Sequence, residues 1–239
     1  MDVRKGHPYC YARNCKNFFI LELVLEVSIV EKGLKKSAAL ILIFIIVISV
    51  ITGCGMNEKD AKAYVQATLD ANYKGIFKEY IKITDSTEKE AKEMYKNNMD
   101  TVMSSFVADD SITEDVSEKY KELFQEIYAK ANYTIGKVEK TGEGFDVEVQ
   151  AMQLQVFDGI EDELVEITKK EVGKSKEQLS EEEIDTIAYE TLYDLLSEKV
   201  KDPIYGNEQT IIVRVVKDSD GIWMISDSDL TEIDKALFR

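Results

Sequence analysis

The chain has 239 residues and carries 30 Lys and Arg against 46 Asp and Glu, a formal net charge of −16 at pH 7. After residue 53 it is more acidic still, with 23 basic and 42 acidic residues. Such a surface repels the phosphates of nucleic acids, because binding them requires Lys and Arg to displace counterions. We therefore expect no nucleic-acid partner and interpret the charge as a solubility feature rather than a cation-binding one.

Cysteine and histidine are confined to the first quarter of the chain. The three cysteines are Cys10, Cys15 and Cys54, and the one histidine is His7. The remainder therefore lacks a disulfide framework, a Cys/His zinc site and any nucleophile pair built on His or Cys. We predict no metal, no cofactor and no catalytic residue, and thus a protein that is not an enzyme. A hydrolase that uses paired carboxylates is the alternative left open by the many acids.

An uncharged run of 17 residues, 37–53, follows Lys35 and Lys36. As a helix it would span about 25 Å, less than the ~30 Å hydrocarbon core of a bilayer. A short apolar segment with a positive flank and a small residue at its end is typical of a secretory signal. We predict a signal peptide over 34–53, with 54–239 outside the cytoplasm because the two lysines stay inside.

The run ends in Ile51, Thr52, Gly53 and Cys54. This ending resembles the lipobox of bacterial lipoproteins, in which an apolar residue, a small or β-branched residue and Gly or Ala precede an invariant Cys. The resemblance implies that the signal is cut before Cys54 and that the Cys54 sulfur receives a diacylglyceryl group. Two acyl chains give stable membrane anchoring, whereas one is marginal. The alternative is an ordinary short membrane helix that ends in Gly-Cys.

Residues 1–33 form an N-terminal extension ahead of this signal. It contains an apolar patch from Phe18 to Val30 that Glu22 and Glu26 interrupt. One interpretation is a long cytoplasmic leader. We prefer a mis-assigned start, with the true start near Leu34, because the basic flank of the signal lies unusually deep in the chain.

The exported segment opens with apolar residues at helical spacing. The pattern predicts a first helix that ends at Gly75 and a short helix over 76–83. A longer helix follows, for which we predict Asp85 or Ser86 as the N-cap and Glu88 as the capping-box partner of Asp85. The segment 111–116 is predicted to end this helix and to cap the next.

The third and fourth of these helices carry Met and Tyr at helical spacing. Such stripes are usually core, but Met fits irregular cavities and Tyr needs a partner for its hydroxyl. We therefore also predict an apolar ligand pocket between these helices and the sheet. Its candidate lining residues are Met94, Tyr95, Met99, Met103, Tyr120, Tyr128, Phe145 and Trp223.

The spacing of the apolar residues then changes from the 3.6-residue period of a helix to the two-residue period of a strand. Segment 133–157 predicts a hairpin with its turn at 141–144, and a parity change at Ala151–Met152 predicts a β-bulge. After the bulge, Met152, Leu154 and Val156 are predicted to be buried.

Two further segments complete the domain. Segment 160–201 predicts a helical insertion, in which Ser180 and Glu183 form a capping box. A second hairpin is predicted over 210–226, and a short terminal helix after it.

This order of elements predicts an α+β domain over 54–239. Several N-terminal helices pack on a curved antiparallel sheet of about four strands, with a helical insertion between two hairpins. The opening helix, "YKGIFKEY" at 73–80 and "DGIWMI" at 220–225 resemble small exported proteins of the nuclear-transport-factor-2-like, cone-shaped class. Many Gram-positive lipoproteins of unknown function share that pattern. The resemblance implies a fold class and a cellular context and no catalytic residue.

We therefore predict a lipid-anchored protein on the extracytoplasmic face of a Gram-positive cell membrane. It is expected to bind an envelope component, such as a protein, or a small apolar ligand. One alternative is a structural or assembly partner of a membrane or cell-wall complex, which requires an exposed apolar patch. The other is the carboxylate hydrolase, which requires two acids with opposed environments in one cleft.

Overall fold

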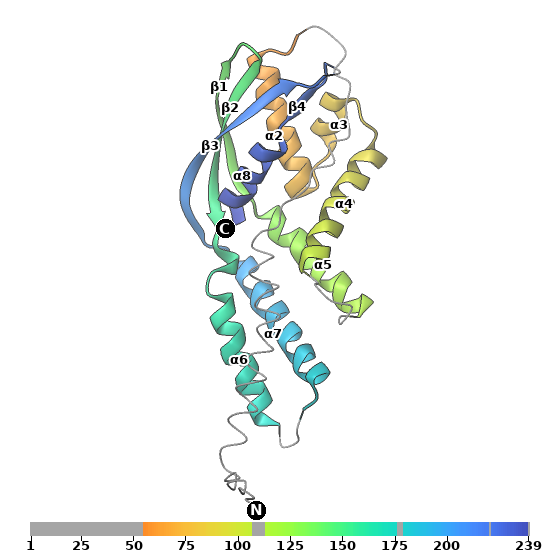
Figure 1. Cartoon of the computed structure of the whole chain (residues 1–239), viewed down its shortest axis with the longest axis vertical. Coiled ribbons are helices and arrows are strands. Elements are labelled where there is room, and N and C mark those ends of the chain that lie inside the picture. Colours follow the sequence, from red (N-terminus) through yellow and green to blue (C-terminus); the bar gives the residue numbers. More distant parts are fainter. Residues whose placement is uncertain (1–54, 107–112, 176–178, 220, 239) are drawn as a thin grey trace, which may run out of the picture.

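The computed structural model describes residues 55–106, 113–175, 179–219 and 221–238. Within these ranges, seven α-helices and a four-stranded antiparallel sheet form an α+β architecture, with four of the helices ahead of the first strand (Figure 1). The predicted fold class is thereby confirmed. The extension, the signal segment and Cys54 lie outside the described residues.

Helix α2, Glu58–Lys74, ends at Gly75, as the sequence predicts. The side chain of Asn57 accepts from the N–H of Asp60, and the side chain of Asp60 accepts from the N–H of Asn57, which makes a capping box. Gly75 ends the helix in the left-handed conformation, with φ 63°. Nine of the 17 residues of α2 are buried, because the helix is covered by the sheet on one side and by other helices on the other.

The cap of the longer helix differs from our prediction. Helix α3 is Lys78–Thr84 and α4 is Glu88–Phe106. The N–H of Thr87 donates to the Glu90 carboxylate over 2.7 Å, and the N–H of Glu90 donates to the Thr87 hydroxyl over 3.2 Å. Asp85 instead ends α3 with φ 56°. Asp, Ser and Thr are all good N-caps, so three in succession leave the start of a helix ambiguous.

Helix α5, Glu114–Ala129, is capped by Thr113 and leads into the sheet. The strands are β1 Asn132–Lys140, β2 Gly144–Leu154, β3 Tyr205–Lys217 and β4 Trp223–Ile225. Their spatial order equals their chain order, and every neighbouring pair is antiparallel.

Strand β2 contains the predicted irregularity, but later than expected. Alternate burial continues through Ala151, and the register with β3 shifts between Met152 and Leu154. The prediction that Met152 is buried was wrong, whereas Leu154 and Val156 are buried as predicted.

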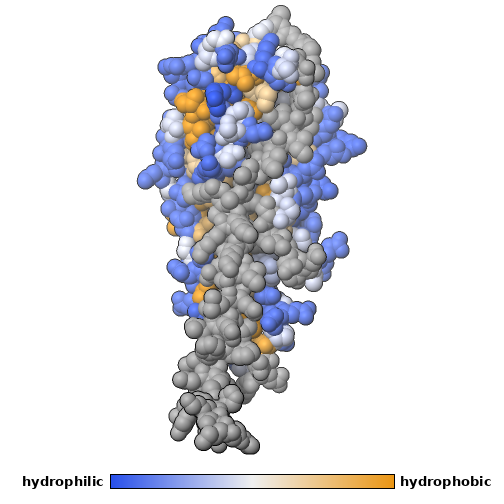
Figure 2. Space-filling model, viewed as in Figure 1, coloured by the Kyte–Doolittle hydropathy of each residue, from blue (hydrophilic) through white to orange (hydrophobic). Residues whose placement is uncertain are grey.

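One face of the sheet carries the core and the other faces solvent. Helices α2 and α8, Asp227–Phe238, cover the inner face. Figure 2 shows mainly hydrophilic side chains on the visible surface, with a small apolar area over the strands. The buried inner residues are Tyr133, Ile135, Phe145, Val147, Val149, Ala151, Val213, Val215 and Ile225.

The predicted helical insertion is a helical hairpin that we call the arm. After a 3-10 turn, Gln155–Phe157, it consists of α6, Ile160–Lys174, and α7, Glu181–Lys201. The capping box at the start of α7 forms as predicted. Figure 1 shows the arm projecting from one end of the sheet, opposite the end that holds the β1–β2 and β3–β4 turns. We call the latter the turn end.

Candidate functional site

The structure places most of the eight predicted pocket residues in the main core. Met99, Met103, Tyr120, Tyr128 and Phe145 are buried there. Met94 is buried in a second, smaller cluster with Ala67, Ala71, Tyr80 and Ala91. Tyr95 and Trp223 are half-buried at the edge of the main core. The eight residues are thus divided between two clusters, and the ligand pocket stays a prediction.

The two sheet-side members lie at the turn end. The rings of Phe145 and Trp223 are 5.6 Å apart, and the Tyr64 hydroxyl donates to the Trp223 carbonyl over 3.2 Å. The Lys217 ammonium lies 5.1 Å from the centre of the Trp223 ring. Tyr128 instead contacts Phe238, the last residue of α8.

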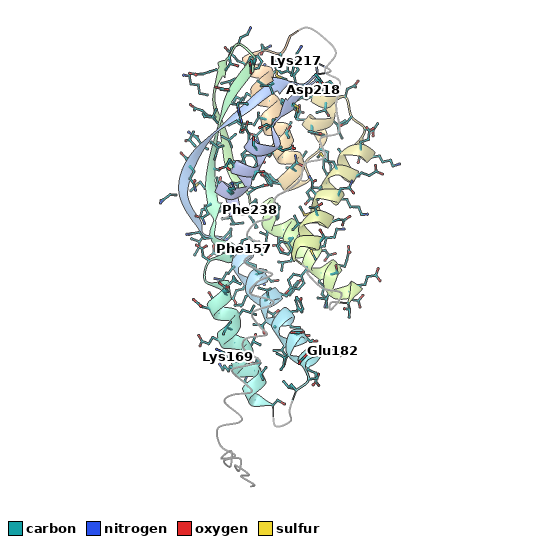
Figure 3. All side chains as sticks on the ribbon, viewed as in Figure 1. Phe157, Lys169, Glu182, Lys217, Asp218 and Phe238 are labelled. Atoms are coloured by element: carbon teal, nitrogen blue, oxygen red, sulfur yellow. The ribbon has the colours of Figure 1, made fainter. Side chains whose placement is uncertain are left out.

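Two hydrogen bonds from tyrosines to carboxylates occur around a group of rings that we call the aromatic cluster: Tyr73, Tyr128, Tyr133 and Phe238. The cluster lies where α2, α5, β1 and α8 meet. The ring of Tyr73 is 6.2 Å from Tyr128, 6.0 Å from Tyr133 and 5.8 Å from Phe238. Tyr73 is fully buried, and its hydroxyl donates to the Asp234 carboxylate over 2.5 Å. Figure 3 labels Phe238, which marks this place between the sheet and the arm.

A second carboxylate lies on the outer side of the cluster. The Tyr133 hydroxyl donates to Asp70 over 2.7 Å, and the Gln66 amide donates to the same carboxylate over 2.9 Å. The Lys74 ammonium lies 3.1 Å from Asp70 and 4.1 Å from the centre of the Tyr133 ring. About a quarter of the Asp70 and Lys74 side chains is exposed, at 23% and 26%, so this side of the cluster reaches solvent.

The pKa shifts of these tyrosines and of Asp70 favour hydrogen bonds in which the hydroxyl donates and the carboxylate accepts. Burial, and then the charge of Asp234, raise the pKa of Tyr73 well above its usual value. Burial and the bond to Asp70 likewise raise the pKa of Tyr133. Burial alone would raise the pKa of Asp70, but the bonds from Tyr133, Gln66 and Lys74 lower it overall. A general acid at neutral pH needs a raised carboxyl pKa, so Asp70 is suited to accept hydrogen bonds instead.

Our sequence analysis did not identify Tyr73, Asp70 or Asp234. Tyr73 lies four residues after Leu69 at the edge of the apolar stripe of α2 and is buried in the same core cluster, so helical spacing could have included it. The helix is also buried on a second side. The small residues Ala67 and Ala71, which face α3 and α4, are the signal that could have indicated a second buried face.

Replacing Tyr133 with Phe tests the Asp70 bond through its pH dependence. A carboxylate with a lowered folded pKa adds stability above its unfolded pKa, and this is lost as pH falls through the folded pKa. We therefore expect Tyr133→Phe to cost about 1 to 2 kcal/mol at pH 7 and clearly less at pH 3, in urea unfolding.

The control is Tyr120→Phe. The Tyr120 hydroxyl donates to the Tyr189 carbonyl over 2.6 Å, and that acceptor does not titrate. Its cost should be the same at both pH values. Equal pH dependence in the two variants would show that the Tyr133–Asp70 bond does not hold the carboxylate ionised.

Two features are absent from the described residues. These residues contain no group of three or more His, Cys, Asp or Glu placed to hold a metal ion. Among the same residues, none of the helices combines the length and apolar character needed to cross a membrane.

Comparison with known proteins shows a likeness of fold. No protein-family model matches the chain, and no curated protein matches it. A similar solved structure is that of YcdA from Bacillus subtilis, described as a proposed lipoprotein, with a TM-score of 0.51 at 17% identity. The alignment covers 75% of this chain and 56% of that one, so this chain spans little more than half the length of YcdA.

At this identity the comparison supports the α+β architecture. The lipoprotein description is a property of YcdA, and the likeness itself extends only to the fold. The narrower resemblance to the nuclear-transport-factor-2-like class stays a prediction.

Proposed function

We propose that this chain is a lipoprotein, held on the extracytoplasmic face of the cell membrane by lipid on Cys54, and that it acts by binding. The observation that carries the proposal is the lipobox-like ending at Cys54. The folded domain begins almost at once after it: Met56 belongs to the core and Asn57 caps α2. A processing site is expected at such a boundary between an apolar leader and a folded domain.

Two observations support binding rather than catalysis. Residues 55–239 contain no His, the most frequent proton carrier of catalytic sites, and no Cys, so a nucleophile activated by His is absent. Burial raises the pKa of Asp70, but the bonds from Tyr133, Gln66 and Lys74 outweigh it and lower this pKa, which does not suit the general acid of a carboxylate hydrolase. We propose that the domain binds an envelope component or a small apolar ligand.

The assembly-partner alternative receives less support from the surface. In the described ranges, the large apolar side chains with the greatest exposure are Ile76, Ile204 and Ile212. Ile204 and Ile212 are eight residues apart along an extended segment, roughly 26 Å at 3.3 Å per residue. They are therefore too far apart to form the contiguous patch that this alternative requires.

Replacing Cys54 with Ser is the direct test of the anchor. Serine has no thiol to form the thioether, so we expect complete loss of labelling by radioactive fatty acid and accumulation of unprocessed precursor. The control is Cys15→Ser, which lies ahead of the proposed cleavage site and should leave both readouts unchanged. Lipid labelling that persists in Cys54→Ser would contradict the proposal.

The same membrane preparation tests binding. A small apolar ligand is expected to be recovered by solvent extraction of the purified lipoprotein and identified by mass spectrometry. Lipoprotein that is correctly anchored but yields no extractable compound would favour a protein partner.

A further inference from the structure

The tether between the proposed lipid and the folded body is very short. Cys54 is followed by Gly55, which is exposed, and then by Met56, which is 9% exposed and belongs to the main core. Asn57 is fixed by its capping box with Asp60. Gly55 is therefore the only residue between Cys54 and a part of the chain that is held by packing and hydrogen bonds.

The body is attached to this tether at the turn end. The Lys62 ammonium donates to the Gly136 carbonyl of β1, and the Tyr64 hydroxyl donates to the carbonyl of Trp223, the first residue of β4. In Figure 1 the first described residues, in orange, lie beside the β1–β2 turn. The attachment point is thus fixed at one end of the molecule.

The arm lies at the opposite end. Figure 3 shows Lys217 and Asp218 at the turn end, and Lys169 and Glu182 far away on the two helices of the arm. Strand β3 joins the arm to the turn end through 13 residues, which span about 43 Å when extended. Helix α7 adds 21 residues, about 31 Å. With curvature, the arm tip lies roughly 60 Å or more from the attachment point.

Charge favours an upright body over one that lies flat. Residues 160–201, which contain the arm, carry 13 Asp and Glu against six Lys. The surface of a bacterial membrane rich in anionic lipid repels such a segment over about a Debye length. The covalent lipid holds the turn end against the bilayer, and no comparable attraction acts on the arm.

We infer that the anchored domain stands with its turn end on the phospholipid bilayer and its arm directed away from it. This inference rests on the proposed lipidation of Cys54. The membrane-facing surface consists of the first turn of α2, the β1–β2 turn at 141–143, and the described ends of the β3–β4 turn at Asp218 and Ile222. The arm tip is then the part of the molecule presented farthest from the membrane, to partners in the envelope.

The test places one fluorescent label at either end of the lipidated protein. Gly142, in the β1–β2 turn, and Gly173, in the arm, both have open space around the position of an added Cβ. Residues 55–239 contain no cysteine, so Gly142→Cys and Gly173→Cys each create a single free thiol in the processed protein. The labelled proteins are reconstituted in vesicles of phosphatidylcholine and phosphatidylglycerol that carry an acceptor dye on their headgroups.

Energy transfer to the acceptor is expected to be several-fold greater from position 142 than from position 173. A variant with ten Gly and Ser residues inserted after Gly55 is the control, because such a linker reaches about 17 Å and frees the body to turn. The ratio of the two transfers should fall toward one in that variant.

Equal transfer from the two positions in the unmodified tether, or greater transfer from 173, would overturn the inference. Vesicle flotation and fatty-acid labelling of the same samples report lipidation separately. A protein that is lipidated but shows equal transfer refutes only the orientation, whereas a protein without lipid refutes the anchor and the orientation together.

Discussion

Replacement of Tyr73 with Ala is expected to lower the free energy of unfolding by about 4 kcal/mol, and replacement with Phe by about 2 kcal/mol. The ring is fully buried and touches three other rings, so its removal leaves a cavity that the surrounding core fills only in part. Phenylalanine keeps the ring but removes the hydroxyl that donates to Asp234 over 2.5 Å inside the core.

The difference between the two variants separates packing from hydrogen bonding. Urea unfolding monitored by circular dichroism measures both free energies, provided that the unfolding slope is unchanged. Tyr95→Phe is the matched control, because Tyr95 is half-buried at the edge of the main core, where its ring lies 5.9 Å from that of Phe77. Tyr73→Phe that costs no more than Tyr95→Phe would show that the Asp234 bond adds little to stability.

The sequence predicts the order and type of the elements because each change of period is unambiguous. The stretch from Tyr133 alternates cleanly, and the first hairpin forms as expected. The pair Ser180 and Glu183 predicts the start of α7 because one capping motif stands directly ahead of an apolar stripe. Where several caps compete, as at Asp85, Ser86 and Thr87, the local pattern does not decide where the helix begins. In the structure Asp85 ends α3 and Thr87 caps α4.

Side-chain partnerships between distant segments are harder to predict. Tyr73 and Asp234 are separated by 161 residues, and neither has an unusual local context. Their pairing follows from α8 packing against the sheet beside α2, which is a property of the whole fold. Met94 shows the same limit, because it shares a stripe with Met99 but faces a different cluster. A periodic stripe identifies burial, and the neighbouring elements determine what each buried residue contacts.

The two halves of the arm differ in how they are held. Leu192, Leu196 and Val200 of α7 belong to the main core, and Tyr120 of α5 packs edge-on against Tyr193. The Lys199 ammonium bonds to the Asp158 carbonyl and to the Glu163 carboxylate, each over 2.9 Å. Farther out, Ile184 and Ala188 are buried but belong to neither core cluster of the described residues. The inner half of the arm is therefore part of the body, whereas the outer half is held mainly by α6.

Leu192→Ala is accordingly expected to lower the global free energy of unfolding by about 3 kcal/mol, because it creates a cavity in the shared core. Ile184→Ala, at a similarly buried site in the outer half, should lower it by less than half as much, because that half opens locally before the body unfolds. Denaturant unfolding gives the global values, and hydrogen exchange followed by mass spectrometry detects faster exchange confined to the arm tip in Ile184→Ala. Equal global costs would mean that the arm unfolds only together with the body. If the arm tip unfolds independently, it can change conformation to fit a partner while the anchored body stays folded.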